Sequence, residues 1–325
     1  MTEIASYRRR VARLWSAVGL SGACLLAGCS VLWPPPPAST NANTLPVAAA
    51  SPSKTMPNSE TVSPASGAPM PFYEALAVSL NERRQVLENV CDQNNPVAKR
   101  VLEDYGAMFV AGSQVIAPPV CVFTSEEQVA QFQATAGATA QNIGGVNITL
   151  QAAAMKALQE ARTDAQAQGL DITPRGGEAA RRSFADTVRL WESRFTPALA
   201  HWQEKGRITA AQAAQLRQML LLEQVGGVLE LEKQGLWFSK DFAKSIFYSV
   251  AAPGTSQHLS MLALDVTEFG NPQARAILAQ HGWFQTVQSD LPHFTYLGLV
   301  EKELPSRGLV AVKSGGPTFW IPNVK

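Results

Sequence analysis

Two histidines and one aspartate in this sequence have the residue types and spacing of metal ligands. His258 follows a Pro/Gly loop, and Asp265 follows it in the pattern His-x6-Asp. A second segment, Asp290-Leu291-Pro292-His293, supplies another imidazole. Either pattern alone is common by chance, so the inference rests on their combination. Two imidazoles and one carboxylate form a zinc set that leaves a fourth position for water. We therefore expect His258, Asp265 and His293 to bind Zn2+.

A further carboxylate lies beside this candidate site. Asp290 stands three residues before His293, near enough to act on a water as a general base. Met261, Ala263 and Asp265 share one face of the strand that we expect over residues 260–266. That alternation lets Asp265 return towards His258.

These residues resemble the zinc D-alanyl-D-alanine carboxypeptidases and dipeptidases of bacterial cell walls, including the vancomycin-resistance type. The signature of that family is Ser-x-His-x-x-Gly-x-Ala-x-Asp, followed by Glu-x-Trp-His and an aromatic strand. The resemblance covers roughly residues 145–300, and an upstream Ile-Thr-Pro-Arg run at 172–175 falls where the family has an Arg motif. The matching positions are Ser256, His258, Ala263, Asp265, His293, Phe294, Tyr296 and Gly298.

The resemblance implies a zinc-dependent D,D-carboxypeptidase-like hydrolase that cleaves peptidoglycan stem peptides. It makes the two histidines and Asp265 the zinc ligands, and it puts Asp290 at the place of the catalytic Glu of the family. Ser256 would help to hold the peptide near zinc. Arg175 would stabilise a substrate carboxylate or the developing oxyanion, a task that suits a guanidinium. Alternatively, Arg175 is a surface residue at a turn with no role in the site, and the sequence favours neither interpretation.

Three positions depart from the family pattern. Met261 replaces a Gly, Pro292 replaces a Trp, and Asp290 replaces a Glu, which shortens the carboxylate side chain by one methylene. These departures support an alternative function, a catalytically weak or inactive homologue that binds peptidoglycan. A structural lipoprotein without metal is the third interpretation. The sequence leaves open whether a carboxypeptidase, dipeptidase or endopeptidase bond is cut.

The elements that position these residues indicate an α+β fold, with helices packed on a small antiparallel sheet and the zinc site at that sheet. Residues 145–325 are expected to form the zinc peptidase-like domain, with a helical insertion at about 178–240. Residues 72–144 form a helical region of unknown role. By apolar spacing, helices are expected over 72–91, 96–110, 125–136, 150–168, 178–205, 209–233 and 272–281. Strands are expected over 115–117, 120–123, 170–173, 260–266, 294–300, 308–312 and 318–321.

The N-terminus has the layout of a lipoprotein signal peptide over residues 1–28. A basic segment precedes an apolar run, which ends in Leu-Ala-Gly-Cys at Cys29. Ser30 after that cysteine is typical of outer-membrane sorting, so we expect a lipid anchor at the periplasmic face. An ordinary cleaved signal and an N-terminal anchor helix are the alternatives. Residues 29–71 contain ten of the 21 prolines, all between Pro34 and Pro71, and this composition predicts a disordered tether.

Cysteine and charge content limit the partners. Removal of residues 1–28 and lipidation of Cys29 leave Cys91 and Cys121 as thiols, and in an oxidising compartment such a pair usually bonds. Two buried free thiols are the alternative. The formal net charge of +1 argues against a nucleic-acid partner. We expect a monomer that meets the membrane through its lipid alone.

The lipidation of Cys29 can be tested by replacement. Cys29→Ser removes the thiol that would carry the diacylglycerol, so the protein should leave the membrane fraction and accumulate as an unprocessed precursor. Cell fractionation with immunoblotting measures both effects. Unchanged fractionation would indicate a plain anchor helix instead.

Overall fold

The structure is a computed structural model that describes residues 68–313 and 315–325. The expected signal peptide, Cys29 and most of the expected tether therefore lie outside the described residues. Within them, no helix combines the length and the apolar character needed to cross a membrane.

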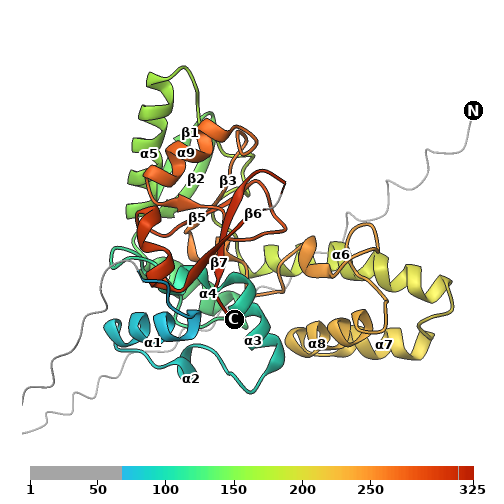
Figure 1. The fold of residues 1–325 in the computed structure, drawn as a ribbon. Helices are drawn as coiled ribbons and strands as arrows, with labels where there is room; N and C mark the ends of the chain where they lie inside the picture. The colour runs from blue at the N-terminus through green and yellow to red at the C-terminus, as the bar shows by residue number, and fades with distance from the viewer. Residues whose placement is uncertain (1–67, 314) are drawn as a thin grey trace, which may run out of the picture. The chain divides into compact units, whose positions relative to one another are not determined.

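A small antiparallel sheet lies at the centre of the residues that the sequence singles out. Its strand order is β3 (Ala263–Asp265), β5 (His293–Tyr296) and β4 (Trp283–Phe284). Two antiparallel hairpins accompany it: β1 (Ala138–Ile143) with β2 (Val146–Gln151), and β6 (Leu309–Lys313) with β7 (Thr318–Pro322). Helices surround these separate sheets, so the expected α+β class is confirmed (Figure 1).

Two helices pack beside each other next to this sheet. α5 (Ala152–Ala167) is rich in alanine, and it contacts α9 (Pro272–Gln280), which in turn contacts β4 (Figure 1). Asn271 begins α9 because its side chain accepts hydrogen bonds from the first-turn amides, and Pro272 suits the first helical position. Both helices therefore start where their sequences provide a cap or a strong helix former.

The N-terminal region contributes to the same core. It contains α1 (Phe72–Glu82), α2 (Leu87–Val90), α3 (Pro96–Tyr105) and α4 (Glu126–Thr135). The helix expected over 72–91 is thus interrupted, since residues 83–86 leave the helical conformation. One buried cluster holds residues from both 72–144 and 145–325; Phe72, Phe109, Leu158, Trp283 and Phe294 are among its members. Short 3-10 helices complete this unit at η1 (Gly106–Val110), η2 (Ile246–Tyr248), η3 (Gln257–Ser260), η4 (Glu301–Glu303) and η5 (Pro305–Arg307).

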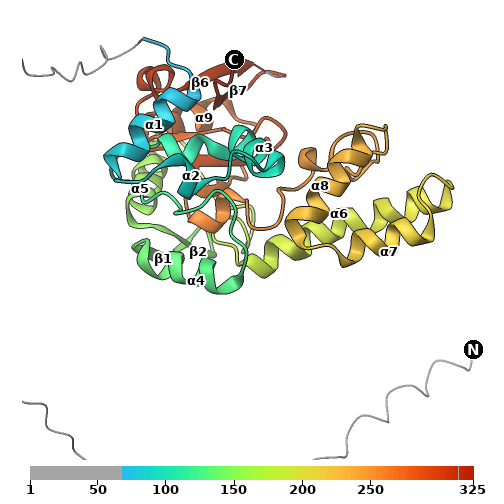
Figure 2. The ribbon, with the colours of Figure 1, turned by 90° about the horizontal axis from the view of Figure 1, so that it is seen from below.

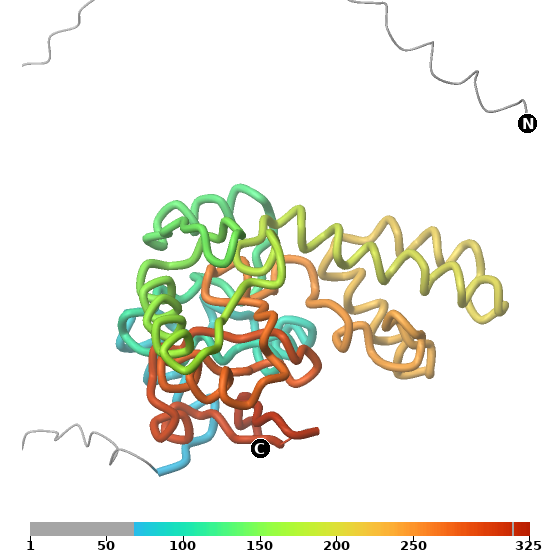
Figure 3. Tube along the Cα trace, turned by 90° about the horizontal axis from the view of Figure 1, so that it is seen from above, coloured from blue at the N-terminus to red at the C-terminus, as the bar shows by residue number. Residues whose placement is uncertain are grey.

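The segment that we expect to be a helical insertion contains three helices with their own core. α6 (Phe184–Glu204), α7 (Ala210–Gln218) and α8 (Leu221–Glu232) lie together to one side of the sheet (Figures 2 and 3). Capping boxes start α6 at Ser183 and α7 at Thr209. Gly227 fits within α8 because a Cβ there would lie 2.7 Å from the side chain of Leu216 on α7. The second buried cluster joins these helices to Val97, Val101 and Tyr105 of α3.

Several expected strands differ from the structure. Residues 115–117, 120–123 and 170–173 form no strand, and the strand expected over 260–266 is limited to Ala263–Asp265. The β1–β2 hairpin stands where no strands are expected. Its turn is Gly144-Gly145, and both glycines have positive φ, the conformation that tight hairpin turns require.

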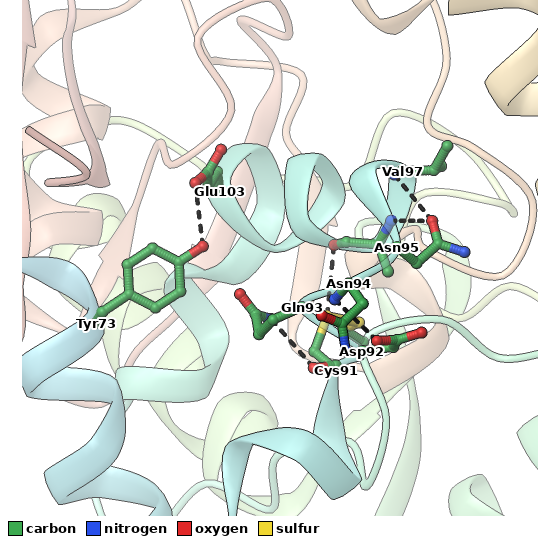
Figure 4. The surroundings of a disulfide bond; sticks show 10 residues. Tyr73, Cys91, Asp92, Gln93, Asn94, Asn95, Val97 and Glu103 are labelled. Carbon is green, nitrogen blue, oxygen red and sulfur yellow. Dashed lines mark hydrogen bonds between the residues drawn. A yellow bond between two sulfur atoms is a disulfide. The ribbon is translucent and has the colours of Figure 1, made fainter.

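The Cys91–Cys121 disulfide is present, so this expectation is confirmed. It lies at the start of α3, where Asn95 caps the helix by accepting from the amides of Val97 and Ala98 (Figure 4). The Tyr73 hydroxyl donates to Glu103 at 3.0 Å and thereby joins α1 to α3 in the same view. The bond closes a loop with a sequence separation of 30 residues.

Removal of this bond should lower stability. In the chain-entropy estimate, a loop of this length is worth about 3–4 kcal/mol of unfolding free energy. A Cys91→Ala, Cys121→Ala double variant should therefore unfold at lower urea concentration, measured by circular dichroism. Reductant should destabilise the wild type and leave the double variant unchanged. Equal stability of the wild type and the double variant in the absence of reductant would contradict the expectation.

Candidate metal centre

Strand pairing brings Asp265 and His293 face to face. In the antiparallel register of β3 and β5, Asp265 is directly opposite His293. Side chains at such paired positions lie on the same face of the sheet, with Cβ atoms about 4.5–5.5 Å apart. One carboxylate and one imidazole are thus juxtaposed by backbone pairing alone.

His258 reaches the same point from the short helix η3, which ends just before β3. The loop ahead of it is fixed by Gly254, whose carbonyl accepts a hydrogen bond from the amide of Phe123 at 2.9 Å. Gly254 has a φ of 75°, and a Cβ at that position would lie 1.9 Å from the Phe123 carbonyl oxygen. Only glycine allows this close approach of two backbones.

The three side chains converge on one point with the spacing of a metal site. His258 Nε2 lies 3.1 Å from His293 Nδ1 and 3.3 Å from Asp265 Oδ1, and the remaining pair is 3.4 Å apart. Ligand atoms in a tetrahedron with zinc bonds of about 2.0–2.1 Å are separated by about 3.3–3.4 Å. The donor atoms therefore fit zinc, and a fourth position is left for water or substrate.

Outer hydrogen bonds determine which nitrogen of each imidazole carries its proton. His258 Nδ1 lies 2.7 Å from the carbonyl oxygen of Ala180, so that nitrogen must donate. His293 Nε2 lies 2.7 Å from Oε1 of Gln257. The amide nitrogen of Gln257 donates to the Tyr105 carbonyl at 2.8 Å, which identifies Oε1 as the atom that faces His293. In their neutral forms the two imidazoles therefore direct their unprotonated nitrogens at each other.

Two lone pairs and a carboxylate oxygen are left pointing at the same place. Asp265 Oδ1 is buried and has no hydrogen-bond partner among the described residues. Arg182 occupies the other oxygen, since its Nη2 donates to Asp265 Oδ2 at 3.0 Å. Buried acceptors without a donor are costly, and the site would be relieved by a cation at the point where they meet.

The electrostatic environment favours the ligand forms of these groups. Burial lowers the pKa of the His258 imidazole; Asp265 opposes this effect and the Arg182 guanidinium adds to it. Burial alone would raise the pKa of Asp265, but the adjacent imidazoles of His258 and His293 hold that pKa well below its ordinary value. A neutral imidazole and an ionised carboxylate are the states that bind a metal ion.

The metal centre opens into a cleft with a volume of about 220 Å3. Ser256 and Asp290 both line it, together with His258 and His293. Asp290 is exposed, and within the described chain it is the one carboxylate of the cleft lining. Its backbone carbonyl accepts from the His293 amide at 3.2 Å, so a tight turn brings the candidate base next to the candidate ligand. The assigned roles of these site residues stay predictions.

Arg175 meets the site through its backbone alone, because its amide donates to the Asp265 carbonyl at 2.9 Å. Its side chain is exposed and rests over the Phe269 ring, 5.4 Å from the ring centroid, and it does not line the cleft. The arginines that do line the cleft are Arg182 and Arg194. Sequence reasoning missed both, as well as Gln257. Gln257 stands between Ser256 and His258 in the motif itself, but no sequence signal distinguishes the two arginines from their neighbours.

The sequence predicts that Met261 and Asp265 share one strand face, which would place the Met261 side chain against Asp265. The structure places it elsewhere. It follows η3 with a φ of 58°, in the left-handed region, and precedes the first residue of β3. Its side chain is fully buried in a small cluster with Phe123, Phe132 and Leu259. The left-handed turn therefore directs the bulk of Met261 away from the strand and towards α4.

No family profile matches the chain, and no curated protein matches it. Among solved structures, a variant of the vancomycin-resistance D,D-pentapeptidase VanY from a VanB-type cassette, in complex with Zn(II), is 17% identical over 54% of this chain and 85% of that chain, with a TM-score of 0.31. VanYB in complex with D-alanine-D-alanine is 16% identical over 52% and 81%, with a TM-score of 0.31. The LdcB LD-carboxypeptidase is 15% identical over 49% and 62%, with a TM-score of 0.27.

With TM-scores of at most 0.31, these matches carry no argument about function. The case for function therefore rests on the geometry of the metal centre.

The orientation of His293 by Gln257 can be tested directly. Gln257→Leu removes the acceptor for His293 Nε2, so the imidazole loses its fixed tautomer and zinc affinity should fall roughly 10- to 100-fold. Competition with a chelating dye measures the affinity, and 15N NMR of the imidazole reports the tautomer. Thr286→Val is the matched control, because Thr286 bonds the same Gln257 oxygen at 3.3 Å without contacting His293. Wild-type zinc affinity in Gln257→Leu would contradict this assignment.

Proposed function

We propose that the protein is a zinc-dependent peptidase of the D,D-carboxypeptidase kind that cleaves peptidoglycan stem peptides. The observation that carries this proposal is the convergence of two lone pairs and an unpartnered carboxylate oxygen at the end of a cleft. His258, Asp265 and His293 would hold the ion. The chemistry that zinc supplies in such a set is polarisation of a peptide carbonyl and activation of water.

The other cleft residues have the chemical types that this reaction needs. Asp290 would accept the proton of the attacking water at its carboxylate, because it lines the same cleft and lies in the turn that leads to His293. Ser256 lines the cleft two residues before His258, where its hydroxyl would hydrogen-bond a peptide. Arg182 keeps Asp265 Oδ1 free for the metal by binding Oδ2.

The proposed substrate and place of action follow from the sequence. The motif resemblance points to peptidoglycan peptides, and the Leu-Ala-Gly-Cys sequence points to a lipid on Cys29. A lipid-anchored monomer on the periplasmic face of the outer membrane could reach the wall through the Pro-rich segment that follows. Cys29→Ser fractionation tests this part separately.

Zinc dependence is tested with His258→Ala. The wild type should bind one zinc per chain and release D-alanine from a stem pentapeptide, whereas the variant should lose both, since one of three ligands is gone. Metal analysis after dialysis and chromatographic product analysis give the two readouts. His281→Ala is the matched control, because His281 bonds Asp164 at 2.7 Å and takes no part in the metal centre. A full equivalent of zinc in His258→Ala would refute the ligand assignment.

The role of Asp290 is tested with Asp290→Asn, which keeps the side-chain size and removes the basicity. Turnover should fall by about 10²- to 10⁴-fold while zinc content stays near one per chain. Unchanged turnover would show that Asp290 is not the base. Zinc binding without turnover in the wild type itself would favour the alternative, a homologue that binds peptidoglycan without cleaving it.

A further inference from the structure

Two threonine hydroxyls lie behind the metal centre and have no part in the proposed reaction. Thr295 belongs to β5, and Thr286 closely follows β4, the strand that pairs with β5. Neither residue has any exposed surface. A buried hydroxyl costs free energy unless it is hydrogen-bonded, and a valine of almost the same shape would avoid that cost. The hydrogen bonds of these two threonines therefore indicate what the hydroxyls do.

Strand alternation places Thr295 on the side of the sheet that holds the ligands. Thr295 is two residues after His293, so the two side chains lie on the same face of β5. Across the sheet, Ala263 of β3 is opposite Thr295, and its methyl group offers no hydrogen-bond partner. The Thr295 hydroxyl instead lies 2.5 Å from Oε1 of Gln257.

The hydrogen of each group in this network can be assigned by counting. The Gln257 amide nitrogen donates to the Tyr105 carbonyl, so the atom that faces His293 is the oxygen, which can only accept. Its two lone pairs are filled by the Thr295 hydroxyl at 2.5 Å and by Nε2 of His293 at 2.7 Å. Thr286 lies farther from this oxygen, at 3.3 Å. Because a hydroxyl carries one hydrogen, the 2.7 Å contact between Thr295 and Thr286 must be a donation from Thr286.

We infer that Thr295 is a positioning residue of the metal centre, which acts through Gln257 on His293. Its hydroxyl holds Oε1 of Gln257 against the N–H of His293, so that the proton stays on Nε2 and Nδ1 keeps its lone pair for the metal. Without this hydroxyl, one of the hydrogen bonds that fix the Gln257 side chain is lost, and a buried acceptor is left incompletely satisfied. The inference rests on the proposed function, because it concerns how the same site holds its metal.

The test compares Thr295→Val, which removes the hydroxyl and keeps the shape, with Thr295→Ser, which keeps the hydroxyl. Zinc affinity should fall roughly 3- to 10-fold in Thr295→Val, as the loss of one neutral hydrogen bond implies, and should stay within about twofold of wild type in Thr295→Ser. Competition with a chelating dye measures the affinity. Thr149→Val is the matched control, because Thr149 is a half-buried threonine of strand β2, outside the metal centre, and this variant should bind zinc like the wild type.

A double-mutant cycle shows whether Thr295 acts through Gln257. Once Gln257→Leu has removed the acceptor, Thr295→Val should cost no further zinc affinity, because the two residues then no longer interact. Circular dichroism checks that each variant folds, and Thr295→Ala takes the place of Thr295→Val if the valine disturbs the strand.

The outcomes separate the inference from the function on which it rests. Wild-type zinc affinity in Thr295→Val would overturn the inference. An equal loss in Thr295→Ser would overturn it as well, since packing rather than the hydroxyl would then be responsible, and so would a further loss in the Gln257→Leu background. Zinc binding without cleavage of a stem pentapeptide would refute the proposed peptidase, and the affinities would still decide the role of Thr295. A wild type that binds no zinc would overturn both.

Discussion

Two imidazole nitrogens with outward lone pairs face each other at 3.1 Å in a buried site. Moving the proton of either ring to the facing nitrogen would break a hydrogen bond, because the Ala180 carbonyl and the Gln257 amide oxygen accept from the N–H groups of His258 and His293. The unpartnered oxygen of Asp265 adds a negative charge to the same point. The elements around the three ligands form the scaffold that imposes this arrangement. Without a bound cation or proton, the arrangement would be repulsive.

The scaffold draws on distant parts of the sequence. Strand register supplies Asp265 and His293, a 3-10 turn supplies His258, and the segment from Ala179 to Arg182 binds both sides of the set. Helix α3 takes part as well, since the Tyr105 carbonyl fixes the Gln257 amide. Residues 72–144 and residues 145–325 therefore share one set of hydrogen bonds around the site.

Much of the site could be predicted because its signals are local. His258, Asp265 and His293 lie in short motifs, and period-two alternation with strand pairing suffices to bring two of them together. Arg182 and Arg194 could not be found in this way, because their places in the cleft depend on how a segment and a helix that lie far away in the sequence pack against the site. Strand boundaries failed for a similar reason. Residues 115–123 are buried in places, but the amides of Cys121 and Phe123 bond single carbonyls, those of Val90 and Gly254, which lie outside the strands. The β1–β2 hairpin did carry a signal, the Gly144-Gly145 turn, that the helical periodicity of its neighbours obscured.

The disulfide has a consequence for metal binding. Cys121 is two residues from Phe123, whose amide binds the Gly254 carbonyl in the loop that leads to His258, and Cys91 lies just before the helix that ends at Tyr105. The two hydrogen bonds that support the ligands, from Phe123 to Gly254 and from Gln257 to Tyr105, thus involve the segments that the disulfide joins. Because the bond holds these segments together, its formation should help the ligand set to assemble, and oxidation should favour metal binding. In a reducing solution the two segments would be held by packing alone, and the three ligands would be less firmly preorganised.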